Sequence, residues 1–283
     1  MRSLLLSAVA AAILTPVRAE TNPIRQALGR LYNFDFAGAH RILDAHKAAQ
    51  PGEPLGPVFS AATMLFHELY RLGILESEFF ADNSRIMETR KLKPDAKIRD
   101  SFYQAIRDSE QLATSRLASN PKDRDALFAL CVGTGMVTDY MSLVERRQFR
   151  SLSWARRSHG HALRLLQADP NFVDAYLTTG LSEYLVGSLP FFVRWIARFD
   201  QVEGSKDQAV RNLERVAASG YYLAPFAKIC LGLIHLREKR PGRTHQLLQE
   251  LAREFPENPL FSREMARLGE KLANGELLDG GSR

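Results

Sequence analysis

The chain has 283 residues, of which 45% are hydrophobic, and its 38 basic and 32 acidic side chains give a formal net charge of +6 at pH 7. This length suits one large domain or two small ones. Without Arg2 and Arg18, which lie in a predicted leader, the charge is +6 − 2 = +4. So mild a charge gives no argument for nucleic-acid binding, although it is compatible with weak attraction to anionic lipid or cell-wall polymer.

The first nineteen residues have the pattern of a secretory signal peptide. Arg2 supplies a positive start, residues 4–14 form an uncharged apolar run, and Val17 and Ala19 place small residues where a signal peptidase cuts. We therefore expect residues 1–19 to be removed after Ala19 and the mature protein to be periplasmic or secreted. An uncleaved anchor is the alternative, but the run is shorter than the roughly 20 apolar residues that span a bilayer. We expect no transmembrane segment in the remaining chain.

Apolar residues recur with the helical period along the mature chain, and no segment shows the sustained alternation of a strand. The expected helices span residues 23–33, 36–49, 58–72, 76–93, 95–119, 123–141, 145–168, 172–186, 207–218, 222–238, 242–254 and 257–274. We expect residues 20–274 to form a single domain. The last helix has a charged outer face, as a capping helix should, and residues 275–283 are expected to be a disordered tail.

One pattern of residues recurs along these helices. Asn120-Pro121 and Asp169-Pro170 each precede a helix, Pro256 stands in the same place near the end, and Leu231-Gly232 forms a Leu-Gly step inside a helix. Proline fits there because it cannot continue one helix but can start the next. The pattern resembles the tetratricopeptide (TPR) repeat family. The resemblance implies an all-α, TPR-like helical-hairpin solenoid of about five helix pairs plus a C-terminal capping helix.

Three glycines, Gly29, Gly180 and Gly232, fall inside the first helix of a pair. A glycine in a helix interior costs about 1 kcal/mol relative to alanine, so its presence there suggests a packing reason. We expect each of the three to mark a place where two helices cross too closely for a side chain.

Residues 188–204 interrupt one helix pair. The two helices of this pair are about seventeen residues further apart than in the others, and such insertions map to loops on one face of a repeat array. A short helix here would place an apolar stripe opposite two arginines; the residues concerned are Phe192, Trp195 and Phe199 on one side and Arg194 and Arg198 on the other. The following turn, Gly204-Ser205-Lys206-Asp207, is similar to a turn in the TPR-like family of the fungal inclusion-body clearance protein, which implies no catalytic residues.

The sequence contains no recognisable catalytic motif, neither G-x-S-x-G nor a phosphate-binding glycine loop. His159 and His161 are two residues apart, so a helix would point them to opposite sides. Cys131 and Cys230 lie in apolar helical patterns and are expected to be buried thiols, although an oxidising compartment would allow them to pair. We therefore expect no enzymatic activity, no metal and no cofactor. A hydrolase without a recognisable motif is the alternative.

In a TPR array the first helices of successive pairs line a concave groove. Carrying the family pattern onto the better-matched helices assigns nine apolar residues to this groove: Phe128, Val132, Met136, Leu177, Leu181, Tyr184, Phe226, Ile229 and Leu233. Such a groove lacks the polar clamp that holds a C-terminal carboxylate and suits a partner helix or an extended hydrophobic peptide. The sequence thus predicts a non-catalytic adaptor for a protein or peptide. Alternatively, residues 188–204 fill the groove, or the protein carries a lipid or another apolar ligand.

A basic stretch runs from Glu145 to Arg157 and holds five arginines. These could bind an acidic partner or lipid phosphate, giving weak contact with a membrane surface. The commoner structure for such a run is a solvated helix face with Trp154 buried on its other side.

Overall fold

The computed structural model describes residues 22–75, 93–188, 202 and 204–277. In these stretches the chain forms eleven α-helices and one π-helical turn, and no strand occurs. The helices are α1 (Pro23–Tyr32), α2 (Phe36–Ala49), α3 (Leu55–Arg71), α6 (Ala96–Ser119), α7 (Arg124–Asp139), α8 (Gln148–Ala168), α9 (Ala175–Ser188), α11 (Lys206–Ser219), α12 (Ala224–Arg237), α13 (Pro241–Glu254) and α14 (Pro259–Ala273); the π-helical turn is η1 (Tyr140–Val144). The predicted signal peptide, most of the predicted helix 76–93, the residues Phe192 to Phe199 and the end of the tail lie outside the described residues.

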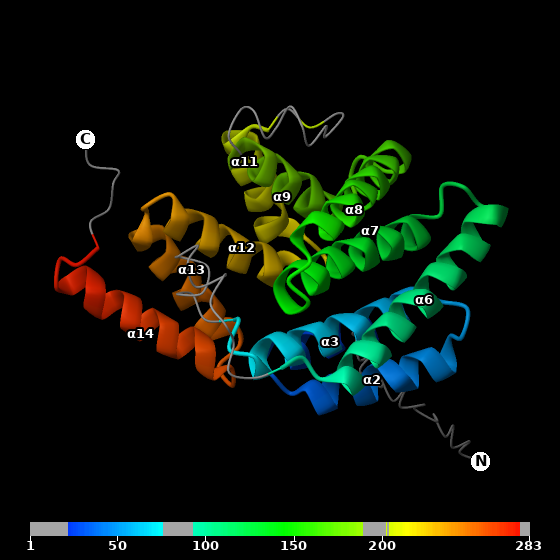
Figure 1. The fold of residues 1–283 in the computed structure, drawn as a ribbon, viewed down its shortest axis with the longest axis horizontal. Helices are drawn as coiled ribbons and strands as arrows, with labels where there is room; N and C mark the ends of the chain where they lie inside the picture. Colours follow the sequence, from blue (N-terminus) through cyan, green and yellow to red (C-terminus); the bar gives the residue numbers. More distant parts are fainter. Residues whose placement is uncertain (1–21, 76–92, 189–201, 203, 278–283) are drawn as a thin grey trace, which may run out of the picture.

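The helices pack as consecutive pairs, in which α1 packs on α2, α3 on α6, α7 on α8, α9 on α11, and α12 on α13. The first helices of neighbouring pairs also contact one another, from α1 to α3, α3 to α7 and α7 to α9. Helix α14 covers α13 at the end of the array (Figure 1). The prediction of an all-α array of five helix pairs with a capping helix is therefore confirmed for the described part of the chain.

Local sequence explains where the helices begin. Asp123 precedes α7, and its carboxylate accepts a hydrogen bond from the backbone N–H of Ala126 at 2.9 Å. Arg116, at the end of α6, donates to the same carboxylate at 2.9 Å, so one side chain caps a helix and ties it to its neighbour. Asp35, Asp95, Ser205 and Asn258 cap their helices in the same way. Side-chain caps of this kind satisfy N–H groups that have no partner within the helix.

Of Gly29, Gly180 and Gly232, only Gly180 lies where two helices cross too closely for a side chain. A Cβ atom on Gly180 would lie 3.1 Å from the Ala209 carbonyl oxygen and 3.1 Å from the Leu213 side chain, so α9 and α11 do cross too closely for a larger residue. A Cβ on Gly232 would meet a Thr244 methyl group at 3.7 Å, an ordinary contact. A Cβ on Gly29 would meet no atom within 4 Å, so the expectation for Gly29 is wrong.

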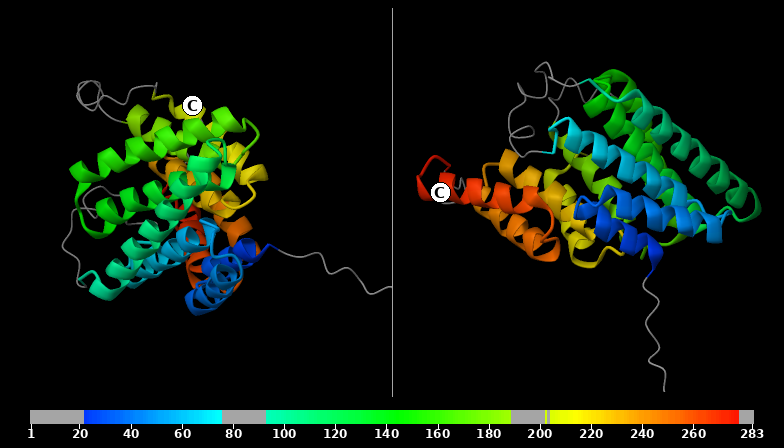
Figure 2. Two further views of the ribbon diagram at one scale, coloured as in Figure 1. Left: turned by 90° about the vertical axis from the view of Figure 1, so that its right-hand side faces the viewer. Right: turned by 90° about the horizontal axis from the view of Figure 1, so that it is seen from below.

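The array closes on itself, so that its first pair contacts its last helices. The Asn258 side-chain amide donates to the Tyr32 carbonyl oxygen at 2.6 Å, and the Glu257 N–H donates to the Asn33 side chain at 3.1 Å. The Tyr32 ring lies 5.1 Å from the Phe255 ring, centroid to centroid. The turned views accordingly show the blue N-terminal pair beside the orange and red C-terminal helices (Figure 2). This closure adds to the predicted repeat architecture a contact between residues more than 220 positions apart in the sequence.

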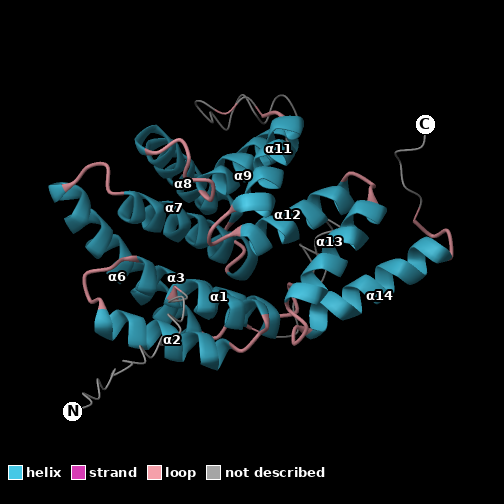
Figure 3. Cartoon of the chain, turned by 180° about the vertical axis from the view of Figure 1, so that it is seen from behind, coloured by secondary structure: helices cyan, strands magenta, loops and turns pink. Residues whose placement is uncertain are grey.

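Helix α7 lies at the centre of the array and ends differently from the prediction. The α-helical hydrogen bonding stops at Asp139, and the chain continues as the π-helical turn η1, where Tyr140 stacks on Phe102 of α6 at 4.5 Å. Together, residues Arg124–Val144 are long and apolar enough to cross a membrane, against the expectation of no such segment. The helix packs, however, against α3, α6, α8 and α9 (Figure 3). A buried core helix of a soluble protein can be equally long and apolar, so this composition alone is weak evidence for a membrane span.

Candidate functional site: the inner face of the array

The structure distributes the nine predicted groove residues between the core and a partly exposed surface. Phe128, Met136, Leu177 and Tyr184 are buried, with Phe128 fully enclosed. The other five, which keep partial exposure, are Val132, Leu181, Phe226, Ile229 and Leu233. The predicted set thus includes side chains that support the surface from below and side chains that form it.

Phe128 belongs to an aromatic cluster near the amino-terminal ends of the first helices. Its ring lies 6.3 Å from Phe59 of α3, 5.5 Å from Tyr222 before α12 and 5.0 Å from Phe172 before α9. Aromatic rings at these separations bury large areas and favour offset or edge-on contacts. The cluster therefore fills the interior of the array where these helices begin, and leaves their later turns to form a surface.

The remaining surface is defined here as the inner face. It comprises Val132, Met136 and Asp139 of α7, Leu181 and Leu185 of α9, and Ile229, Cys230 and Leu233 of α12. On α7 and α9 these residues are three, four or seven positions apart, and on α12 Ile229 and Cys230 precede Leu233 by four and three, so on each helix they lie toward one side. Leu185 follows Leu181 by one helical turn and has 56% of its surface exposed, so it extends the partly exposed apolar stripe of α9.

Asp139 is a feature of the inner face that the sequence analysis missed. It follows Met136 by three residues and Val132 by seven, so all three share one side of α7. Burial raises the pKa of its carboxyl group from an ordinary 3.8 to about 7. Its negative charge is also one cause, after burial, of the raised pKa of Cys230 on α12, which places the carboxylate of α7 near the thiol of α12.

The first turn of α7 carries a second acid, Asp125, on the same side of the helix. Burial raises the pKa of Asp125, while Arg116 opposes the shift from 3.9 Å away. The two carboxylates thus differ in their surroundings. Asp125 has Arg116 nearby, whereas burial alone accounts for the raised pKa of Asp139. The side of α7 between them carries the apolar residues Val132 and Met136.

Both cysteines are free thiols and both are buried. Burial raises the pKa of Cys131 to about 11, and its sulfur contacts the Thr178 hydroxyl at 3.2 Å. Burial also raises the pKa of Cys230. Thiols with raised pKa values are poor nucleophiles at neutral pH, because the thiolate is the reactive form.

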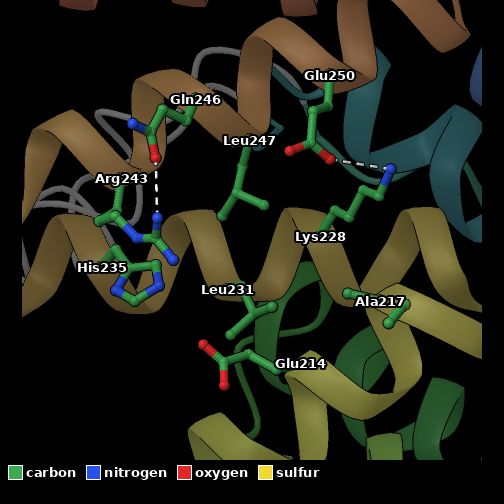
Figure 4. Close-up of a pocket in the computed structure, with 10 residues that line it drawn as sticks. Glu214, Ala217, Lys228, Leu231, His235, Arg243, Gln246, Leu247 and Glu250 are labelled. Atoms are coloured by element: carbon green, nitrogen blue, oxygen red, sulfur yellow. Dashed lines mark hydrogen bonds and ion pairs between the residues drawn. The ribbon is translucent and has the colours of Figure 1, made fainter.

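A small cavity of about 230 Å³ lies on another side of the array, between α11, α12 and α13 (Figure 4). Lys228 on one wall pairs with Glu250 at 3.2 Å, and Arg243 donates to Gln246 at 3.0 Å. Leu231 and Leu247 form the apolar part of its lining. Both basic side chains of the lining, Lys228 and Arg243, are thus already engaged by other lining residues.

The described residues contain no group of three or more histidine, cysteine, aspartate or glutamate side chains that could hold a metal ion. The most buried acid, Glu68, serves structure: it accepts two hydrogen bonds from Arg71 at 2.8 Å and one from the Asp95 N–H at 2.7 Å. His159 is buried, and its ring nitrogens have no hydrogen-bond partner among the described residues. The expectation of no catalysis and no metal stays a prediction.

The basic stretch forms the start of α8. Arg157 stacks over the partly buried Trp154 ring at 4.4 Å and pairs with Glu110 at 3.0 Å, so this arginine belongs to a helix–helix contact. Phe149, by contrast, is 93% exposed beside Arg147 and Arg150. At this end of α8, Arg147 pairs with Glu145 at 3.3 Å.

Comparisons with known proteins match neither a protein family nor a curated protein. Among solved structures, a thermophilic TPR protein from Thermus thermophilus is similar, with 14% identity and a TM-score of 0.46, over 89% of this chain and all of that one. The class of protein follows from the helix pairs described above, which form an all-α array of TPR-like hairpins. Within that class, the chain is a divergent array whose first and last helices touch.

Proposed function

We propose that this protein is an exported, non-catalytic adaptor that binds a protein or peptide partner through the inner face. The observation that carries the proposal is the apolar stripe of α9 and α12, in which Leu185 is exposed and its neighbours Leu181, Ile229 and Leu233 are partly exposed. Apolar side chains gathered on one surface favour an interaction site, whereas isolated ones need no explanation. An amphipathic helix or an extended apolar peptide would bury this stripe.

Export is part of the proposal and rests on residues 1–19. Its test is the mass of the protein recovered from the producing cell and from its envelope fraction. Cleavage after Ala19 gives a mature chain that starts at Glu20, and the protein should then be found outside the cytoplasm. A full-length chain in the cytoplasm would contradict export while leaving the binding function open.

The binding proposal is tested by placing a photo-crosslinking residue at position 185 and capturing partners from the native envelope. A matched control places the same residue at position 149, since Phe149 is also exposed but lies on α8. Crosslinks at position 185 that disappear in a Leu233→Lys variant, with those at position 149 unchanged, would support the proposal. Equal crosslinking at both positions would contradict it.

A second candidate function is transport of a lipid or another apolar ligand, because an apolar face can hold an acyl chain as well as a peptide. Native mass spectrometry of the purified mature protein separates the two functions. A co-purifying lipid of defined mass that Leu233→Lys releases would favour the carrier. A ligand-free protein that still gives position-specific crosslinks would favour the adaptor.

A further inference from the structure

Asp139 differs from the other enclosed acids of the described chain in having no compensating partner. Glu68 accepts hydrogen bonds from Arg71 and a backbone N–H, and Asp174 accepts from the backbone N–H groups of residues 221, 222 and 223. Glu264 pairs with Arg267. Among the described residues no hydrogen bond or ion pair reaches the Asp139 carboxylate.

An uncompensated carboxylate among apolar groups is costly, because its charged form loses hydration and gains no interaction in return. Asp139 retains partial exposure, so a partner arriving at the inner face can reach it. The adjoining change from α-helix to the π-helical turn η1 occurs at this residue, and π-helical turns are frequent at functional sites. Asp139 thus lies on the inner face, has no hydrogen-bond or ion-pair partner among the described residues, and stands where the α-helix changes to a π-helical turn.

We propose that Asp139 recognises a single basic side chain, lysine or arginine, within an otherwise apolar peptide segment bound on the inner face. This inference rests on the proposed function and names the chemistry of its partner. The aliphatic stem of such a side chain would lie along Val132 and Met136 while its charged end pairs with the carboxylate. One isolated carboxylate matches one cation, whereas a metal ion would need further ligands that the described residues do not gather here.

Recognition of this kind depends on pH, because only the ionised carboxylate attracts a cation. Burial is the sole cause of the Asp139 shift, so no charged group on α3, α6, α8, α9 or η1 contributes to it among the described residues. The neighbouring titratable group is the Cys230 thiol of α12, whose raised pKa keeps it neutral. With a pKa of about 7, roughly nine in ten carboxyl groups are protonated at pH 6, so the affinity for a basic segment should fall about tenfold between pH 8 and pH 6.

The test uses the full mature chain and a displayed library of random peptides of about twelve residues, selected at pH 8 on the wild type and on Asp139→Asn. We expect the wild type to enrich apolar peptides with one basic position and Asp139→Asn to enrich apolar peptides without it. The best wild-type peptide and its Lys→Gln form are then compared by fluorescence anisotropy. Wild type should prefer the basic form by at least about tenfold, as for a hydrogen bond to a charged group, and the preference should disappear in Asp139→Asn and shrink at pH 6.

Glu270→Gln, which removes an exposed carboxylate on α14, is the matched control and should retain the wild-type preference. Enrichment of apolar peptides with no basic preference in wild type would overturn the inference and leave the adaptor function intact. Failure of wild type to enrich any peptide would overturn both.

Discussion

Replacing Asp139 with asparagine should make the protein more stable at pH 8 and should change how stability depends on pH. The substitution keeps the shape and polarity of the side chain but removes a charge that the folded protein solvates poorly. The folded-state pKa of about 7 lies above the ordinary 3.8, so between these values the folded state holds a proton that the unfolded state has released. Wild-type stability therefore falls as the pH rises through this window and levels off above pH 7.

The size of the effect follows from the shift. About three pKa units at 1.36 kcal/mol each correspond to about 4 kcal/mol, and the partial exposure of Asp139 reduces this to about 2–4 kcal/mol at pH 8. At pH 5 the folded carboxyl is still protonated, so most of the loss of stability expected between pH 3.8 and pH 7 has yet to occur. The difference in free energy of unfolding between Asp139→Asn and wild type should therefore grow by about 1–3 kcal/mol from pH 5 to pH 8.

Urea unfolding followed by far-UV circular dichroism at several pH values measures this difference, and other titrating groups cancel between the two proteins. Glu270→Gln serves as the control, because its exposed carboxylate should give a curve parallel to wild type. If the Asp139→Asn and wild-type curves are also parallel, the carboxylate is not desolvated in the folded protein. The inferred absence of a compensating partner is then wrong.

Three further predictions concern packing, closure and the thiols. Gly180→Val should destabilise the protein by about 1–3 kcal/mol because its Cβ would meet Ala209 and Leu213 at 3.1 Å. Gly29→Ala, whose Cβ would meet no atom within 4 Å, should instead stabilise the protein by up to about 1 kcal/mol. Equal changes of the two variants in thermal unfolding would contradict this difference in packing. Asn258→Ala should lower the free energy of unfolding by about 1–2 kcal/mol, because it removes both the cap of α14 and the hydrogen bond to Tyr32 of the first helix pair. Amide hydrogen exchange should then become faster at α1 as well as at α14. Faster exchange at α14 alone would mean that the contact between the first and last helices contributes little to stability. Both thiols should react with a thiol reagent at neutral pH only after denaturation, and fast labelling of the native protein would show that they are accessible.

The helix pairs could be predicted from the sequence because their signals are local. Asp95, Asp123 and Asn258 cap helices by bonding to N–H groups two or three residues away, so the same few residues mark each boundary wherever they occur. Prolines at helix starts add a second local signal. The predicted boundaries accordingly agree with the structure to within about three residues for most helices.

The glycine pattern shows where such local reasoning ends. Gly29 and Gly180 occur in the same Gly-containing context of a first helix, yet only Gly180 is crowded by the partner helix. The sequence carries the repeat signature, but the separation of two helices at one point depends on side chains from both. That separation is a property of packing and cannot be read from one helix.

Asp139 was missed for a different reason. The predicted groove residues Phe128, Val132 and Met136 are four positions apart. Asp139 comes three positions after Met136, a spacing that also keeps it on the same side of α7. Acidic residues near helix ends are usually solvated, so the sequence position of Asp139 gives no sign that it belongs to an apolar surface. Its surroundings include Cys230 of α12, a residue far away in the sequence, and no local pattern on α7 reveals that neighbour.

Closure also limits what the inner face can bind. In an open array the concave surface lengthens with every repeat, and long extended partners can follow it. Here α1 touches the start of α14, and the cluster of Phe59, Phe128 and Tyr222 fills the interior where the first helices begin. The exposed part is restricted to the later turns of α7, α9 and α12, so the partner segment should be short, a single helix or a few extended residues. A short segment gains little from apolar burial alone, which is why one enclosed carboxylate can decide which segment binds.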